Sequence, residues 1–97
     1  MKHASSLKTQ RKQAGTWLKE LREDAGLTQL DVAKRLGFKY YAFVSQVETG
    51  FSRVPNEKIE AWAQTLGVDP APFARRLLSY YEPELHRVLY RLKSAQG

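Results

Sequence analysis

The stretch GFKYYAFVSQVETG, residues 37–50, begins and ends with glycine, which predicts a short helix between two turns. We expect the helix over residues 40–49, with Val44 and Val47 on the face that turns toward a core. The two tyrosines and Phe43 are then too many apolar rings for that one face. A short helix with large rings left over indicates a surface that presses against another molecule.

The composition of this 97-residue chain is that of one globular domain. It has no cysteine, which excludes disulfides and thiolate metal sites. Because no apolar run could span a bilayer or act as a secretory signal, we expect a cytoplasmic protein with no membrane partner. The net charge is +6, and residues 1–40 carry nine Lys and Arg against four Asp and Glu. A nucleic-acid partner and a merely solvated basic surface both fit this charge.

Helical spacing of apolar residues recurs along the chain, and no alternating run predicts a strand. We therefore expect an all-α fold of about six short helices. Gly15 should weaken the first turn of the first helix, so residues 1–11 are expected to form a mobile basic arm. The helices are expected over residues 12–25, 28–36, 40–49, 56–66, 70–80 and 83–92.

Cap signals support three of these helix starts. Thr28 with Asp31 three residues later predicts a capping-box exchange. Asn56 is a candidate N-cap of the fourth helix, and Asp69 caps the fifth ahead of a proline.

Only three residues separate the second expected helix from the third. So short a link forces a sharp crossing, which is the geometry of a helix-turn-helix. Such a pair can place its second helix in the major groove of DNA. One face of helix 40–49 would then meet the core and another would meet the base edges. For Phe43 the sequence leaves two alternatives: burial in the core or contact with the groove.

Three motifs resemble those of the lambda-repressor-like (Cro/cI, or XRE) helix-turn-helix DNA-binding family. They are LxxLRxxxGLTQxxVAxxLG at residues 18–37, VSQVExG at residues 44–50 and RVPNxxIxxWAxxLGVD at residues 53–69. The resemblance implies the compact five-helix domain of that family over residues 12–80. The turn GFKYY is one residue longer than is usual in the family, and residues 81–97 extend beyond the five-helix domain.

The resemblance also implies roles for individual residues. The base-reading residues would be Tyr41, Ala42, Ser45 and Gln46. Gln46 is the strongest of these, because an amide donates and accepts together, as adenine N6 and N7 require. The phosphate-contacting residues would be Gln29, Lys39, Tyr40, Thr49 and Arg53. Glu48, the acid of this helix, would pair inward with Arg22 as a structural ion pair.

Catalytic and metal sites are not expected. His3 and His86 have no second histidine or paired carboxylate at ligand spacing. Ser45 has no histidine within helical reach, so a nucleophile is not indicated. We therefore expect no enzyme activity, no metal, no cofactor and no small-molecule ligand.

An apolar stripe marks the C-terminal segment, residues 81–97. Its members follow helical spacing and are Leu85, Val88, Leu89 and Leu92. Two arrangements would bury this stripe: folding back on the five-helix core, or contact with a second copy across a two-fold axis, helped by Tyr80, Tyr81 and Tyr90. The second is favoured, because one recognition helix reads too few base pairs for useful specificity.

The function that these features predict is a sequence-specific, double-stranded DNA-binding transcriptional regulator of bacterial or phage type. It would bind a near-palindromic operator as a homodimer and associate with the nucleoid when bound. The alternative is the antitoxin of a toxin–antitoxin pair with autoregulatory DNA binding, which adds a toxin protein as a partner. A third possibility is an interaction module whose DNA binding is vestigial.

Overall fold

The fold comes from a computed structural model that describes the backbone of residues 2–91 and the side chains of residues 8–91. Over these residues every regular element is helical, which confirms the predicted all-α class. The elements are α1 (Lys2–Asp24), α2 (Gln29–Arg35), α3 (Ala42–Thr49), the 3₁₀ turn η1 (Asn56–Lys58), α4 (Ile59–Leu66), α5 (Pro70–Tyr81), α6 (Pro83–His86) and the π-helical turn η2 (Arg87–Arg91).

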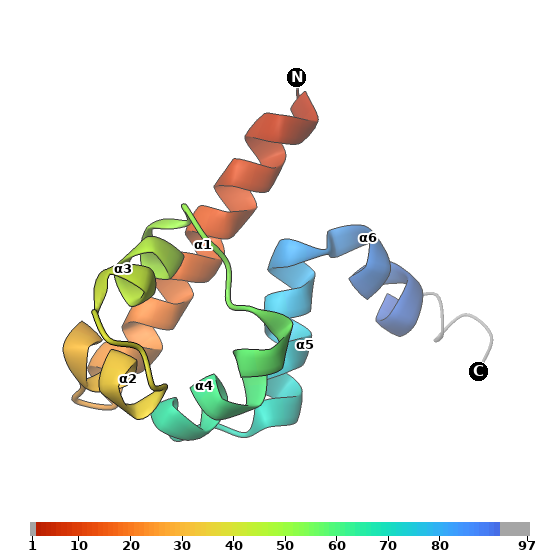
Figure 1. Ribbon diagram of the computed structural model, residues 1–97. Coiled ribbons are helices and arrows are strands. Elements are labelled where there is room, and N and C mark those ends of the chain that lie inside the picture. Colours follow the sequence, from red (N-terminus) through yellow and green to blue (C-terminus); the bar gives the residue numbers. More distant parts are fainter. Residues whose placement is uncertain (1, 92–97) are drawn as a thin grey trace.

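The C-terminal half of α1 lies between the other helices of the domain (Figure 1). It packs against α3 on one side and α5 on the other, and α4 bridges α2 and α5. Trp17 of α1 contacts Phe73 of α5, with ring centroids 5.3 Å apart. The buried core side chains are Ala14, Leu18, Val32, Ala33, Leu36, Val44, Val47, Val54, Trp62, Ala63, Leu66, Phe73, Leu77 and Tyr81.

An aromatic cluster settles the position of Phe43. Its ring lies edge-on to Phe38 at 5.3 Å and to Trp62 at 6.5 Å. Edge-to-face pairs at these distances stabilise a core beyond their buried area. Phe43 is therefore a half-buried residue that packs against the core.

Helix α1 begins at Lys2, although the sequence analysis places its start at residue 12. Residues 2–11 are continuous with α1, because they hold good helix formers such as lysine, glutamine and alanine without glycine or proline. Gly15, the expected weak point, lies well inside the helix. A β-carbon on Gly15 would lie 2.1 Å from the backbone oxygen of Glu48, so the glycine is what lets α1 and α3 approach each other.

Two further helix starts differ from those expected. Helix α3 begins at Ala42, and the residues from 38 to 41 form the turn before it. Asn56 does not cap α4: it opens the turn η1, and its side-chain oxygen accepts a hydrogen bond from Arg53 at 3.1 Å. A chain that must first make this turn reaches helical geometry only at Ile59.

The other two cap predictions are confirmed. Thr28 and Asp31 exchange hydrogen bonds of 3.0 and 2.9 Å as a full capping box at the start of α2. The side chain of Asp69 accepts from the backbone N–H of Ala71 at the start of α5.

Within the described residues the C-terminal segment lies beside α5, and the ring of Tyr90 in η2 packs 5.0 Å from the guanidinium of Arg75 in α5. Helix α6 and the turn η2 leave the end of α5 and lie apart from α1 to α4 (Figure 1). Leu85, Val88 and Leu89 keep 49%, 49% and 46% of their surface exposed. Leu92, the fourth predicted member of the stripe, lies outside the described residues. Tyr81 does not belong to this apolar surface, because it is buried in the core.

Candidate nucleic-acid interface

Helix α3 has two distinct faces. Val44, Val47 and Glu48 are buried against the rest of the domain. Ala42, Gln46 and Thr49 are exposed, and their spacing of four and three residues puts them on one opposite face. Ser45 is half-buried at the edge of this face. Except for Ser45, the predicted base-reading residues of α3 therefore lie in the open.

The turn before α3 directs its tyrosines outward. Phe38 packs into the aromatic cluster, and its backbone N–H donates to the carbonyl of Ala33 at 2.8 Å. With Phe38 held inward, Tyr40 and Tyr41 keep 67% and 54% of their surface exposed. The ammonium of Lys39 lies 5.5 Å from the centre of the Tyr40 ring. The turn thus places a cation and two tyrosines before the start of the exposed face.

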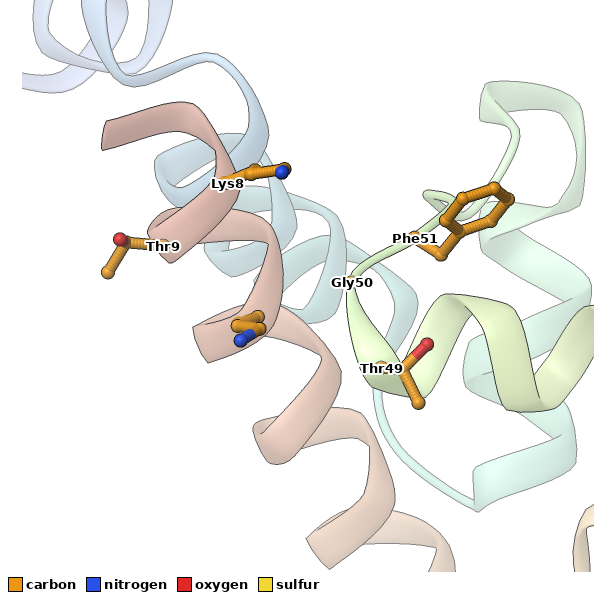
Figure 2. A pocket seen from close by; sticks show the side chains of 6 residues that line it. Lys8, Thr9, Thr49, Gly50 and Phe51 are labelled. Atoms are coloured by element: carbon orange, nitrogen blue, oxygen red, sulfur yellow. The ribbon is translucent and has the colours of Figure 1, made fainter. Parts of the chain in front are cut away.

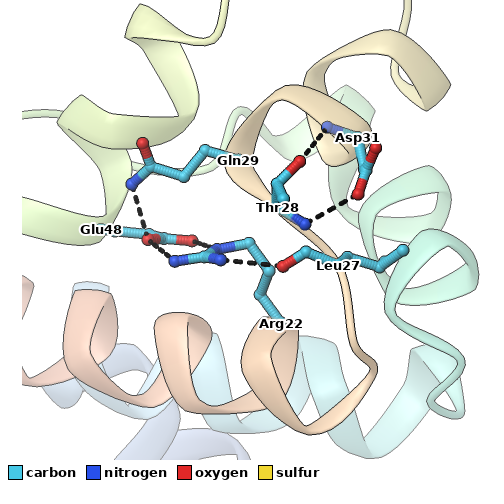
Figure 3. Close-up of polar contacts among 6 residues, drawn as sticks. All are labelled: Arg22, Leu27, Thr28, Gln29, Asp31 and Glu48. Carbon is cyan, nitrogen blue, oxygen red and sulfur yellow. Dashed lines mark hydrogen bonds and ion pairs between the residues drawn. The ribbon is translucent and has the colours of Figure 1, made fainter.

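The predicted partners Arg22 and Glu48 lie in contact (Figure 3). The guanidinium donates to both carboxylate oxygens, at 2.7 and 3.1 Å, and to the carbonyl of Leu27 at 2.9 Å. The hydrogen bond to Glu48 raises the pKa of Arg22 above its usual value. This arrangement turns the only acid of α3 inward and neutralises it, so the exposed face of the helix carries no carboxylate.

Gln29 joins this ion pair from α2 (Figure 3). Its side-chain amide donates to Glu48 at 3.0 Å, and the side chain is half-buried. One carboxylate therefore ties together α1, α2 and α3, which fixes the crossing of the helix-turn-helix. The phosphate contact predicted for Gln29 stays a prediction.

Arg53, another predicted phosphate ligand, is held by contacts within the domain. It donates to Glu82 and to Asn56, both at 3.1 Å, and its guanidinium lies 4.5 Å from the centre of the Tyr81 ring. A phosphate at Arg53 would have to compete with these groups, and the role stays a prediction.

Tyr81 anchors the loop that follows α3. Its hydroxyl oxygen accepts a hydrogen bond from the buried backbone N–H of Val54 at 3.2 Å. Burial raises the pKa of Tyr81, because the phenolate would lose its water. This contact does not follow from the sequence, since the partners lie far apart in the chain and no motif joins them.

Comparison with known proteins supplies the family. A family model described as a helix-turn-helix domain matches residues 13–76, which span most of α1 and run into α5. No curated protein and no solved structure matches the chain. No helix in the described part of the chain is long and apolar enough to cross a membrane. Since the match covers more than half of the chain and includes α2, the turn and α3, the protein belongs to the helix-turn-helix domain family, in agreement with its Cro/cI-like motifs.

Proposed function

We propose that the protein is a sequence-specific, double-stranded DNA-binding transcriptional regulator of bacterial or phage type. It binds a near-palindromic operator as a homodimer, in the cytoplasm at the nucleoid, with α3 in the major groove. The observation that supports this proposal best is the division of α3 into a buried face and an exposed face free of acid. A helix-turn-helix offers such a face to base edges.

Gln46 is the main base-reading residue in this proposal. It is exposed at the middle of the open face, and its side-chain oxygen accepts a long hydrogen bond, 3.4 Å, from the hydroxyl of Ser52. That weak bond leaves the amide available to an adenine edge. Ala42 offers a methyl group to thymine one turn earlier, and Tyr41 and Ser45 flank the same face.

Phosphate contacts then frame the reading face. Lys39 and Tyr40 lie exposed before α3, and Thr49 lies exposed at its last residue. These groups contact the backbone and set the docking angle without reading sequence. Gln29 and Arg53 complete the proposed set, each in competition with its contacts inside the domain.

The homodimer rests on the apolar surface of α6 and η2. Leu85, Val88 and Leu89 are half-exposed on a segment that lies beside α5 and apart from α1 to α4. A symmetric pairing of this surface buries the three side chains of both copies and brings two recognition helices to one operator.

Selection of bound sequences from a random duplex pool tests the proposal. We expect one enriched site with two-fold symmetry. Gln46→Ala should then weaken binding to that site by about 1–3 kcal/mol and change binding to random duplex little. Gln64→Ala is the matched control, because this glutamine is exposed on α4, away from the reading face. A pool without enrichment, or equal losses on both duplexes, would contradict the proposed function.

A further inference from the structure

A hollow of about 480 Å³ lies where the N-terminal half of α1 passes the end of α3 (Figure 2). Its lining residues are Lys8, Thr9, Lys12, Thr49, Gly50 and Phe51. We call it the basic hollow. The sequence leaves open whether Lys8, Arg11 and Lys12 grip phosphate as an arm or form a solvated tail, and it does not place the two lysines beside the loop after α3.

The walls of the basic hollow are fixed by a close backbone contact. Gly50 ends α3 with a φ of 86°, a left-handed conformation. A β-carbon on Gly50 would lie 2.8 Å from the backbone nitrogen of Lys12. The loop after α3 therefore rests directly on α1, and it brings Phe51 to the lining of the same hollow as the lysines.

The charge of the basic hollow is not compensated by the protein. Lys8 and Lys12 are four residues apart on α1, so their ammonium groups lie on one face of the helix, and Lys8 reaches toward the loop that carries Phe51 (Figure 2). Among the side chains of residues 8–91, no carboxylate forms an ion pair with either lysine. Two like charges at this spacing destabilise a helix, and a bound anion would relieve that repulsion.

The opposite wall is apolar. Phe51 exposes 77% of its surface, more than any other large apolar residue described in the chain. Two ammonium groups and an exposed ring that line the same hollow suit a ligand that joins an anion to an apolar body. A nucleotide backbone, with its phosphates and deoxyribose rings, has this chemistry.

Thr49 connects the basic hollow to the reading face of α3, since its side chain belongs to both. We propose that the basic hollow holds the DNA backbone just outside the base pairs that α3 reads. Lys8 and Lys12 bind the phosphates, and Phe51 packs against a deoxyribose. This inference rests on the proposed function and extends its footprint along α1.

Two duplexes test the inference: one that covers only the selected site, and one in which the same site is extended at both ends. Binding of the full chain is followed by fluorescence anisotropy as a function of salt. The logarithm of the binding constant falls with the logarithm of salt by about 0.9 for each phosphate contacted. Lys8→Gln and Lys12→Gln should each lower that slope by about 0.9 on the extended duplex and leave it unchanged on the short one.

Two further variants sharpen the result. Phe51→Ala should weaken binding to the extended duplex several-fold without changing the salt slope, because it removes contact area and no charge. Arg75→Gln is the control for a lost positive charge, since Arg75 lies on α5 and contacts Tyr90. It should leave the slope at the wild-type value. All four side chains are exposed, so the variants should keep the wild-type fold, which circular dichroism checks.

The outcomes separate this inference from the proposed function. Suppose that the wild-type protein prefers its selected site. Lysine variants that leave the salt slope unchanged, or that change it equally on both duplexes, then overturn the inference about the basic hollow but not the proposed function. A wild-type protein without sequence preference overturns the proposed function, and the slopes on random duplex then still decide the inference. Tight binding of free deoxyadenosine monophosphate that Phe51→Ala abolishes would instead assign the hollow to a nucleotide and overturn the DNA contact.

Discussion

At the scale of single residues, the pair formed by Arg22 and Glu48 is the costliest contact to break. Each partner is almost fully buried, with side chains 11% and 5% exposed. Removing one leaves an uncompensated buried charge, so Arg22→Ala and Glu48→Ala should each lower the free energy of unfolding by roughly 3–5 kcal/mol. The double variant should lose less than the sum of the two. Urea unfolding of all four proteins measures the coupling, and simple additivity would show that the pair does not interact.

Tyr81 offers a second residue-scale prediction. Replacing it with phenylalanine keeps the ring under Arg53 but removes the acceptor of the buried Val54 N–H. An unsatisfied buried donor costs about 1–3 kcal/mol, so Tyr81→Phe should destabilise the domain by that amount. Tyr90→Phe, at an exposed tyrosine, is the control and should have little effect. Equal stabilities in chemical denaturation would mean that water satisfies the N–H.

At the scale of elements, the crossing of α1 and α3 depends on Gly15. Alanine normally favours a helix over glycine by about 1 kcal/mol. Here the added methyl group would meet the backbone of α3 at 2.1 Å, and backbone yields less readily than a side chain. Gly15→Ala should therefore destabilise the protein by about 1–3 kcal/mol in spite of its helix propensity. Thr16→Ala, at an exposed residue of the same helix, is the control and should leave the melting temperature unchanged or raise it. If thermal unfolding showed Gly15→Ala to be the more stable of the two variants, the close crossing would be rejected.

The capping box of α2 predicts a pH dependence. Hydrogen bonds from the backbone and then the side chain of Thr28 lower the pKa of Asp31 from its usual value of 3.8. A lowered folded pKa contributes stability that is present above the unfolded pKa and is lost as pH falls through the folded one. Melting temperatures of wild type and Asp31→Asn should therefore differ at pH 7 and converge below about pH 4. A difference between the two proteins that does not change with pH would contradict this linkage.

The elements that the sequence predicts well are those with local causes. The Thr28 and Asp69 caps and the apolar spacing of α2 to α5 act within a few residues, and they place these helices in the structure. The start of α1 and the role of Gly15 do not follow from local rules, because a contact with α3 decides the glycine. Likewise, no spacing reveals that Arg53 contacts Glu82, since the two meet only after α5 packs on the core.

The candidate site follows the same division. The inward turn of Glu48 and the outward face of Gln46 come from the family motif and helical periodicity, and the structure arranges both residues in this way. The basic hollow could not be predicted, because it needs a helical path through Lys8 and a loop that lies on α1. Long-range backbone contact, which no short pattern encodes, creates that site.

At the scale of the whole molecule, the N-terminal part of the chain is basic and the C-terminal part is nearly neutral. Residues 1–40 carry most of the net charge of +6, whereas residues 41–97 hold seven Lys and Arg against six Asp and Glu. The C-terminal segment therefore offers little repulsion to a second copy, and its three described apolar side chains stay half-exposed in the single chain. Exposed apolar side chains of this kind support the proposal that a second copy covers them.

Truncation after Glu82 tests this assembly, because it removes α6 and η2 but keeps the contact between Glu82 and Arg53. The shortened chain should remain folded, be monomeric, and bind a half-site as weakly as it binds the full operator. Leu85→Asp in the full chain should give the same result, since a charge in a paired apolar surface opposes association. Arg87→Gln, at an exposed cation of the same segment, should leave the dimer intact. Light scattering at micromolar concentration measures the mass, and a full-length chain that is monomeric both free and on operator DNA would disprove the dimer.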